Sequence, residues 1–187
     1  MVTVFVADEQ QDHPVDGDRW SAFVERVLAA EGIEGEAELS VLFVDEAHIT
    51  DLNERFMGHT GPTDVLSFPL DAVADHNPGS GAGAGEGDAV AEVVAGGGGP
   101  LARPFFDPDD QPLLLGDVVV CPAVAARQAP THAGSYDDEV ALLLVHGVLH
   151  VLGLDHAEPA ERDAMQARER TLLAELHGPL AGDPWAS

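Results

Sequence analysis

The chain contains 187 residues, 45% of them hydrophobic, which suffices for one globular domain with a sizeable core and argues against disorder throughout. Acidic residues outnumber basic ones by 34 to 8, and the formal net charge of −26 argues against unspecific binding to nucleic acid, although it permits a local site. No apolar run approaches the roughly 18 residues of a membrane span, and the first residues lack the features of a signal peptide. We therefore expect a cytoplasmic protein that does not contact membranes.

The first part of the chain alternates between predicted strands and predicted helices. Strands are indicated over residues 2–6, 37–45 and 63–70, and helices over 20–28 and 46–57. Asp45 is placed to cap the second helix, because a short acceptor side chain there can bond the free backbone N–H groups of the first turn. Gly58 is expected to end the same helix.

Residues 71–110 interrupt this alternation. The segment contains nine of the 20 glycines together with eight acidic residues and one arginine, and it shows no apolar periodicity. Such a composition predicts a flexible insertion between two strands and not a second domain. We accordingly expect residues 1–187 to form a single domain.

The second part of the chain resumes the alternation. Residues 113–121, LLLGDVVVC, predict a fourth strand ending at a buried Cys121, and as a lone cysteine this residue can form neither an internal disulfide nor a cysteine-based zinc cluster. A short helix near 123–129, a long buried helix that opens with SYDDE and a last helix over 158–176 follow. The order predicts an α/β (or α+β) domain with a small mixed sheet of about four strands packed by helices.

The stretch HGVLHVLGLDH, at the end of the long helix, places three histidines close together. His146 and His150 are one helical turn apart and share a face. Gly153 can take the left-handed conformation that ends a helix, so the chain can double back and bring His156 to the other two. A single histidine in an apolar helix is usually a core residue, but three at this spacing predict one zinc ion per chain. Three neutral ligands leave one position open, as in catalytic zinc sites.

The same spacing, H-x-x-x-H-x-x-G-x-x-H, is that of the metzincin proteases, so a protease is an alternative. Residue 147 is glycine, whereas those proteases use a glutamate there as the general base that activates the zinc-bound water. Glycine cannot move a proton, and this disfavours proteolysis. Three neutral ligands also leave the full charge of the zinc ion, which favours an anionic substrate such as a phosphodiester.

Together, three segments of the sequence resemble those of the YbeY family of bacterial ribosomal RNA maturation factors. They are the histidine motif, the stretch LNERFMGHTGPTDVLSFPL and the stretch LLLGDVVVCP. The resemblance implies a single-domain α/β metalloprotein whose three histidines hold zinc, acting as a single-strand-specific endoribonuclease in 16S ribosomal RNA 3′-end maturation and ribosome quality control. The implied partners are ribosomal RNA and the ribosome or small-subunit assembly proteins, with no DNA. Leu154, where the family usually has tyrosine, and the length of the 71–110 segment depart from its pattern.

The resemblance also assigns roles outside the histidines. Arg55 corresponds to an arginine that is thought to contact RNA, and we favour phosphate binding over a solvated helix end because a guanidinium can grip two phosphate oxygens. Asp155 is either a hydrogen-bonding partner of a zinc-binding histidine or a turn residue. Three further residues, Thr63, Asp64 and Ser67, are expected to build a turn and a strand start, and His59 and His132 are interpreted as surface histidines.

Two functions from different classes follow from these features. The first is a zinc-dependent endoribonuclease in which Arg55 positions a phosphodiester and the metal assists its cleavage. The alternative is a ribosome-associated assembly factor whose zinc is structural and which needs no catalysis. An open fourth position on the zinc favours the first function, and a fourth protein ligand favours the second.

Overall fold

The computed structural model describes residues 1–70, 112–154 and 158–186. The predicted insertion at 71–110, the predicted zinc ligand His156 and its neighbour Asp155 all lie outside the described residues. The described elements are β1 (Val2–Asp8), α1 (Gly17–Ala30), β2 (Ala37–Phe43), α2 (Glu46–Leu52), the π-helical turn η1 (Asn53–Met57), β3 (Val65–Pro69), β4 (Leu113–Val120), α3 (Pro122–Gln128), the 3₁₀ turn η4 (Ala129–Thr131), α4 (Tyr136–Val151) and α5 (Pro159–Leu176).

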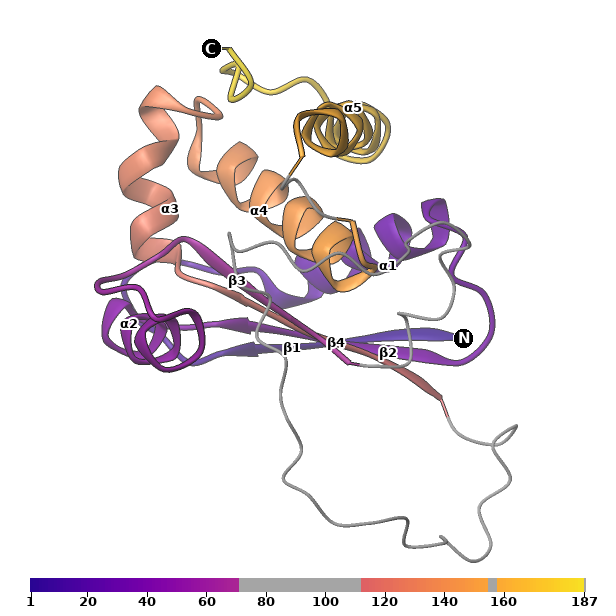
Figure 1. Cartoon of the computed structure of the whole chain (residues 1–187), viewed down its shortest axis with the longest axis horizontal. Coiled ribbons are helices and arrows are strands. Elements are labelled where there is room, and N and C mark those ends of the chain that lie inside the picture. Colours follow the sequence, from indigo (N-terminus) through magenta and orange to yellow (C-terminus); the bar gives the residue numbers. More distant parts are fainter. Residues whose placement is uncertain (71–111, 155–157, 187) are drawn as a thin grey trace, which may run out of the picture.

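The four strands form one mixed sheet in the order β1-β2-β4-β3. β1, β2 and β4 run parallel, and β3 is the antiparallel edge strand beside β4. Helices α1, α4 and α5 lie on the same face of the sheet, and α4 crosses directly above β3 and β4 (Figure 1). The predicted α/β domain with a four-stranded mixed sheet is therefore confirmed.

Helix α4 rests directly on the sheet because it has no side chain at its closest point of approach. A Cβ atom added at Gly147 would lie 2.6 Å from Cγ1 of the buried Val118 in β4. From the neighbouring strand β3, the hydroxyl of Ser67 donates a hydrogen bond of 3.1 Å to the carbonyl oxygen of Gly147. This close contact fixes the height and rotation of α4 over the sheet.

The C-terminal end of α4 has the turn that its glycine predicts. Gly153 has φ 88°, a left-handed conformation that favours glycine. Its N–H bonds the carbonyl of His150 at 2.9 Å, and the N–H of Leu154 bonds the carbonyl of Leu149 at 3.0 Å. These two bonds form a Schellman motif, which satisfies the last carbonyl groups of the helix and reverses the chain.

The predicted helix over 46–57 is only partly regular. Asp45 caps its start as expected, accepting a bond of 2.8 Å from the N–H of His48. The α-helix ends at Leu52, however, and the chain continues as the π-helical turn η1 before Gly58, which has φ 69°. At the start of this turn, the buried Asn53 donates a side-chain hydrogen bond to the carbonyl of Gly61 at 2.9 Å, so a contact with the following loop accompanies the change of helix type.

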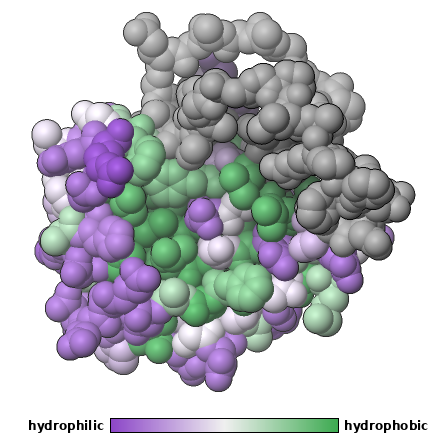
Figure 2. Space-filling view, turned by 90° about the horizontal axis from the view of Figure 1, so that it is seen from below, coloured by the Kyte–Doolittle hydropathy of each residue, from purple (hydrophilic) through white to green (hydrophobic). Residues whose placement is uncertain are grey.

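The two faces of the sheet differ in how they are covered. The main core lies between the sheet and helices α1, α4 and α5. On the second face, apolar side chains gather at the surface (Figure 2), and Phe5 and Leu114 are 54% and 50% exposed. None of the helices in the described residues is long and apolar enough to cross a membrane.

Candidate functional site

His146 and His150 face each other on the last two turns of α4. Their Nε2 atoms lie 3.1 Å apart, and the ring centroids are 4.6 Å apart with an interplanar angle of 79°. Spacing by four residues explains this arrangement, because such residues lie one above the other on a helix. Each ring therefore presents its Nε2 atom to the other, within hydrogen-bonding distance.

A buried carboxylate holds the ring of His146 from behind. Glu169 of α5 lies 2.7 Å from Nδ1 of His146, and its other oxygen accepts a hydrogen bond of 2.8 Å from Nε1 of Trp185. Glu169 is only 4% exposed. Because an ionised carboxylate can only accept hydrogen bonds, we assign the proton of neutral His146 to Nδ1, which leaves a lone pair on Nε2.

This donor set fits a zinc ion in its chemistry. Two nitrogens bound to one tetrahedral zinc lie roughly 3.3 Å apart when each Zn–N distance is about 2.0–2.1 Å, close to the separation seen here. A carboxylate on the far nitrogen of a histidine is also the usual support of a metal-bound imidazole. The described residues contain no group of three or more His, Cys, Asp or Glu side chains placed to hold a metal, and the predicted third ligand, His156, is not among them.

A cavity of about 440 Å³ opens beside His146. It lies between α4 and α5, and the start of β3, the loop before α4 and the C-terminal segment close its sides. The described residues that line it are Asp64, Val65, His132, Leu142, Leu143, His146, Arg162, Met165, Gln166, Glu169, Pro184 and Trp185. Among these residues, Arg162 is the only arginine or lysine. The cavity therefore offers imidazole, carboxylate and guanidinium groups over an apolar floor.

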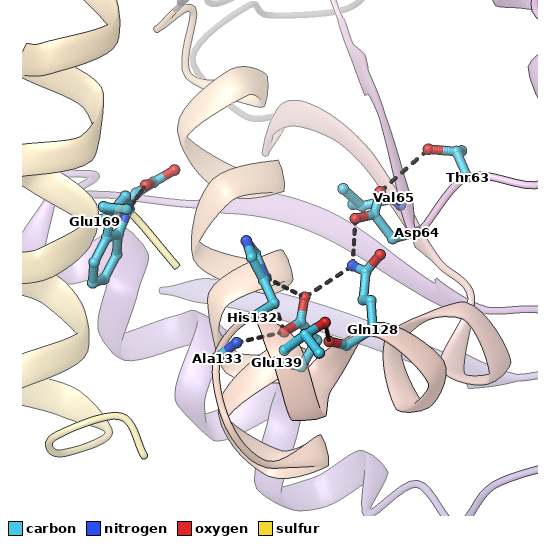
Figure 3. Close-up of polar contacts among 10 residues, drawn as sticks. Thr63, Asp64, Val65, Gln128, His132, Ala133, Glu139 and Glu169 are labelled. Carbon is cyan, nitrogen blue, oxygen red and sulfur yellow. Dashed lines mark hydrogen bonds and ion pairs between the residues drawn. The ribbon is translucent and has the colours of Figure 1, made fainter. Parts of the chain in front are cut away.

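A second histidine in this cavity also rests on a buried carboxylate. Glu139 of α4 is fully buried and lies 2.8 Å from Nδ1 of His132 (Figure 3). Its oxygens also accept hydrogen bonds from the N–H of Ala133 at 3.1 Å and from the side chain of Gln128 at 2.9 Å. The amide of Gln128 bonds Asp64 as well, at 2.7 Å, which links the network to the start of β3.

Sequence reasoning missed most of this second group. His132 was interpreted as a surface histidine, and its side chain is indeed 40% exposed, but it lines the cavity and its Nδ1 rests on the buried Glu139. In the sequence, Glu139 is an acidic residue in the first turn of a helix. A solvent-exposed negative charge at that position interacts favourably with the helix dipole, so the pattern gives no sign of burial. The available signal was that His132, in the turn leading into an apolar helix, is only seven residues from Glu139 in the first turn of that helix.

Gly147 also shows why the protease base has no counterpart here. A side chain at this position would point into the sheet, where Val118 Cγ1 stands 2.6 Å from the added Cβ. A glutamate at residue 147 therefore has no room in this packing, because its side chain would leave the helix toward the sheet and not toward the cavity. The fold supports the sequence argument against a metzincin-type protease.

Arg55 lies apart from the cavity lining. It belongs to η1, its side chain is 63% exposed, and its guanidinium bonds Asp51 at 3.1 Å. The adjacent Phe56 packs against Phe68 of β3 with ring centroids 5.4 Å apart. The described lining of the cavity does not include Arg55, and the arginine that it does include, Arg162, was not singled out in the sequence.

The turn before β3 is built as predicted. One oxygen of Asp64 accepts bonds from the N–H of Val65 at 2.8 Å and from the hydroxyl of Thr63 at 3.2 Å. Ser67 faces α4 through its bond to Gly147. His59 is exposed, as expected for a surface histidine. Asp64 has an additional place in the cavity lining, which the turn pattern did not indicate.

Comparison with known proteins agrees with the resemblance seen in the sequence. The family model described as Endoribonuclease YbeY matches residues 5–177. Proteins named Endoribonuclease YbeY from Salinispora tropica and Frankia casuarinae are 45% and 42% identical over 161 and 177 residues; these matches cover 86% and 95% of this chain and 87% and 76% of theirs.

A solution structure from Thermotoga maritima has the same fold. It superposes with a TM-score of 0.51 at 20% sequence identity, and the match covers 94% of this chain and 89% of that one. The similarity of fold and the sequence matches agree in extent, since both include nearly all the described elements. The chain therefore belongs to the endoribonuclease YbeY family.

Proposed function

We propose that the protein is a zinc-dependent endoribonuclease that cleaves single-stranded RNA. The observation that carries the proposal is the pair of histidines on α4, whose Nε2 atoms lie 3.1 Å apart beside an open cavity, with a buried glutamate behind one of them. Family membership supports RNA as the substrate, because the related proteins are named as endoribonucleases.

His146, His150 and His156 are the proposed ligands of one zinc ion per chain. When bound, zinc would act as a Lewis acid toward a phosphodiester and lower the pKa of a bound water. Glu169 keeps the His146 ring in the orientation that presents Nε2, and Trp185 in turn holds Glu169. Asp155 has the proposed role of orienting a ligand histidine.

The net charge of −26 makes short-range contacts essential for RNA binding. Arg162 is placed to meet a phosphate inside the cavity. Arg55 is proposed to meet another phosphate outside it, because its ion pair with the exposed Asp51 is weakly held and readily exchanged. The RNA strand would then extend from the cavity past the start of β3 toward η1.

The proposed cellular task is maturation of the 3′ end of 16S ribosomal RNA and ribosome quality control in the cytoplasm. The proposed partners are the ribosome or small-subunit assembly proteins. Incubation of the purified protein with immature small subunits tests this task. Shortening of the 16S RNA at its 3′ end is expected, and unchanged ends would restrict the activity to other RNAs.

A direct assay tests the enzyme itself. Metal analysis of the purified protein is expected to find one zinc per chain, and a single-stranded RNA is expected to be cut while a duplex of the same sequence is not. A chelator should abolish cleavage, and added zinc should restore it. Protein that contains zinc but cuts no RNA would favour the assembly-factor alternative, and active protein without zinc would contradict the metal dependence.

A further inference from the structure

His132 brings a second supported imidazole into the cavity that contains His146. Its Nδ1 lies 2.8 and 3.0 Å from the two oxygens of Glu139. In Figure 3 the ring extends from Glu139 toward the side on which Glu169 lies. Within the described part of the chain, no hydrogen bond is made to the Nε2 atom of His132, and the residue lines the cavity.

The carboxylate behind this imidazole is strongly fixed. Glu139 has no exposed surface, and three donors, from His132, Ala133 and Gln128, converge on it. Burial of a carboxylate is costly unless such bonds compensate for lost water. A carboxylate on Nδ1 orients an imidazole and stabilises its protonated form, and this is what proton transfer through Nε2 requires.

Both glutamate–histidine pairs are anchored to the same helix face. Glu139 and His146 are seven residues apart on α4, or about two turns and about 10 Å along the helix axis. His132, held by Glu139, and His146 therefore enter one cavity from neighbouring positions. A phosphodiester strand in this cavity can contact both imidazoles.

We propose that His132 is the proton-transfer residue of the RNA cleavage, with Glu139 as its positioning residue, an inference that rests on the proposed function. Nε2 of His132 removes a proton from the attacking water as the water oxygen forms a bond to phosphorus. The bond from phosphorus to the leaving ribose oxygen breaks, and the proton passes from Nε2 to that oxygen. This assignment supplies the base that Gly147 cannot provide.

The test uses the full chain, its zinc content and a single-stranded RNA. In His132→Asn the amide nitrogen can occupy the position of Nδ1 and keep the bond to Glu139, but the side chain cannot transfer a proton. We expect kcat to fall roughly 10²- to 10⁴-fold, with zinc content, KM and thermal unfolding unchanged. His48→Asn is the matched control, because His48 is 46% exposed and also has a glutamate, Glu9, as its neighbour, outside the cavity.

A rescue experiment separates proton transfer from a structural role. His132→Ala should lose activity similarly, and free imidazole should restore part of it in a concentration-dependent way without altering His48→Asn. Glu139→Gln should lower kcat at least 10-fold with KM unchanged, because the imidazole loses its oriented support.

The outcomes distinguish this proposal from the proposed function. If the parent cleaves RNA and His132→Asn cleaves it equally well, or if imidazole restores nothing to His132→Ala, the role of His132 is overturned and the nuclease stands. If the parent itself cleaves no RNA at any zinc concentration, the proposed function fails and this inference fails with it.

Discussion

Two histidines enter one cavity with Nδ1 on a buried glutamate, yet the surroundings of their Nε2 atoms differ. His146 Nε2 lies 3.1 Å from Nε2 of His150, whereas the described residues place no second imidazole beside His132 Nε2. Glu169 and Glu139 are both almost fully buried. The two proposed roles, metal binding for His146 and proton transfer for His132, therefore follow from the group that faces Nε2 and not from the carboxylate on Nδ1, which the two histidines share.

The largest expected effect is a difference in bound metal between a variant of His150 and a variant of His132. His150→Ala should lose both bound zinc and RNA cleavage, because one of two facing nitrogens is removed. His132→Asn should keep one zinc per chain and lose cleavage. Metal analysis beside an RNA cleavage assay measures both properties, and loss of zinc from His132→Asn would remove the distinction between the pairs.

Variants of Glu169 and Glu139 should also differ in zinc binding, with a smaller effect. Glu169→Gln should weaken zinc binding about 10- to 100-fold, since the carboxylate behind a ligand histidine orients the ring and raises its basicity. Glu139→Gln has the same change of shape and charge and should leave zinc affinity unaltered. Competition with a chromophoric chelator gives both affinities. Equal weakening by the two substitutions would show that both carboxylates serve the metal.

The arginines test how far the substrate extends beyond the two histidines. Arg162→Glu should reduce cleavage of single-stranded RNA of any sequence at least 10-fold, because the arginine lines the cavity and its proposed partner there is phosphate, which every sequence shares. Arg55→Glu should reduce it as well, with zinc content unchanged in both variants. Arg127→Glu is the control, since that arginine pairs with Glu46 and does not line the described cavity. If Arg55→Glu cleaves RNA as well as the parent protein does, the RNA does not contact Arg55 and its contacts are limited to the cavity.

Helix α4 carries one member of each glutamate–histidine pair, Glu139 and His146, so its position on the sheet affects both pairs together. Gly147→Ala should lower the free energy of unfolding by about 1–3 kcal/mol, because the new methyl group meets the stiff, buried side chain of Val118. In Gly17→Ala the added Cβ is 3.5 Å from Val6 Cγ1, an ordinary contact, and stability should hardly change. Denaturant unfolding compares the two, and equal stability would mean that α4 has room to move over β4.

Asp138 of α4 and His177, which follows α5, form another histidine–carboxylate pair, outside the cavity, that should matter least for catalysis. Burial alone would raise the pKa of Asp138, but hydrogen bonds from His177, Ala181 and Ser135 outweigh it and lower that pKa. A carboxyl with a lowered folded-state pKa stabilises the fold above its unfolded value of about 3.9, and this contribution is lost as pH falls through the folded-state pKa.

Asp138→Asn should therefore reduce stability at pH 7 by about 1–2 kcal/mol and have a smaller effect below pH ~4. RNA cleavage by the folded variant should equal that of the parent. Asp137→Asn is the control, because its partner Arg19 is exposed and such surface pairs contribute less than about 1 kcal/mol. A pH-independent loss in Asp138→Asn would mean that shape, and not charge, matters at this site.

Local patterns predicted the parts of the fold that depend on neighbours in sequence. The four strands, the cap at Asp45 and the glycine turn after α4 all appear where the sequence indicated them. The π-helical turn η1 was not predicted, because the contact of Asn53 with the carbonyl of Gly61 depends on the folding of the following loop.

The site was less predictable because its carboxylates come from distant or misleading positions. Glu169 meets His146 from a helix 23 residues later, and nothing in its polar surroundings in sequence marks it as buried. Glu139 follows two further acids in sequence, Asp137 and Asp138, and nothing in that run marks it as the residue around which packing places Gln128 and His132. Tertiary contacts, and not residue type, separate these two glutamates from the other acidic residues.

The seven-residue interval between Glu139 and His146 limits how related chains can vary in length. Inserting or deleting one residue within it would rotate one end of α4 by about 100° relative to the other. Glu139 would then turn away from His132 while His146 stayed in the cavity, or the reverse, and the sheet contact at Gly147 allows no compensating turn of the helix. Substitutions between the two residues can be absorbed by repacking, but a change of spacing cannot. Constancy of this interval is thus a criterion, independent of residue identity, for recognising chains that retain both pairs.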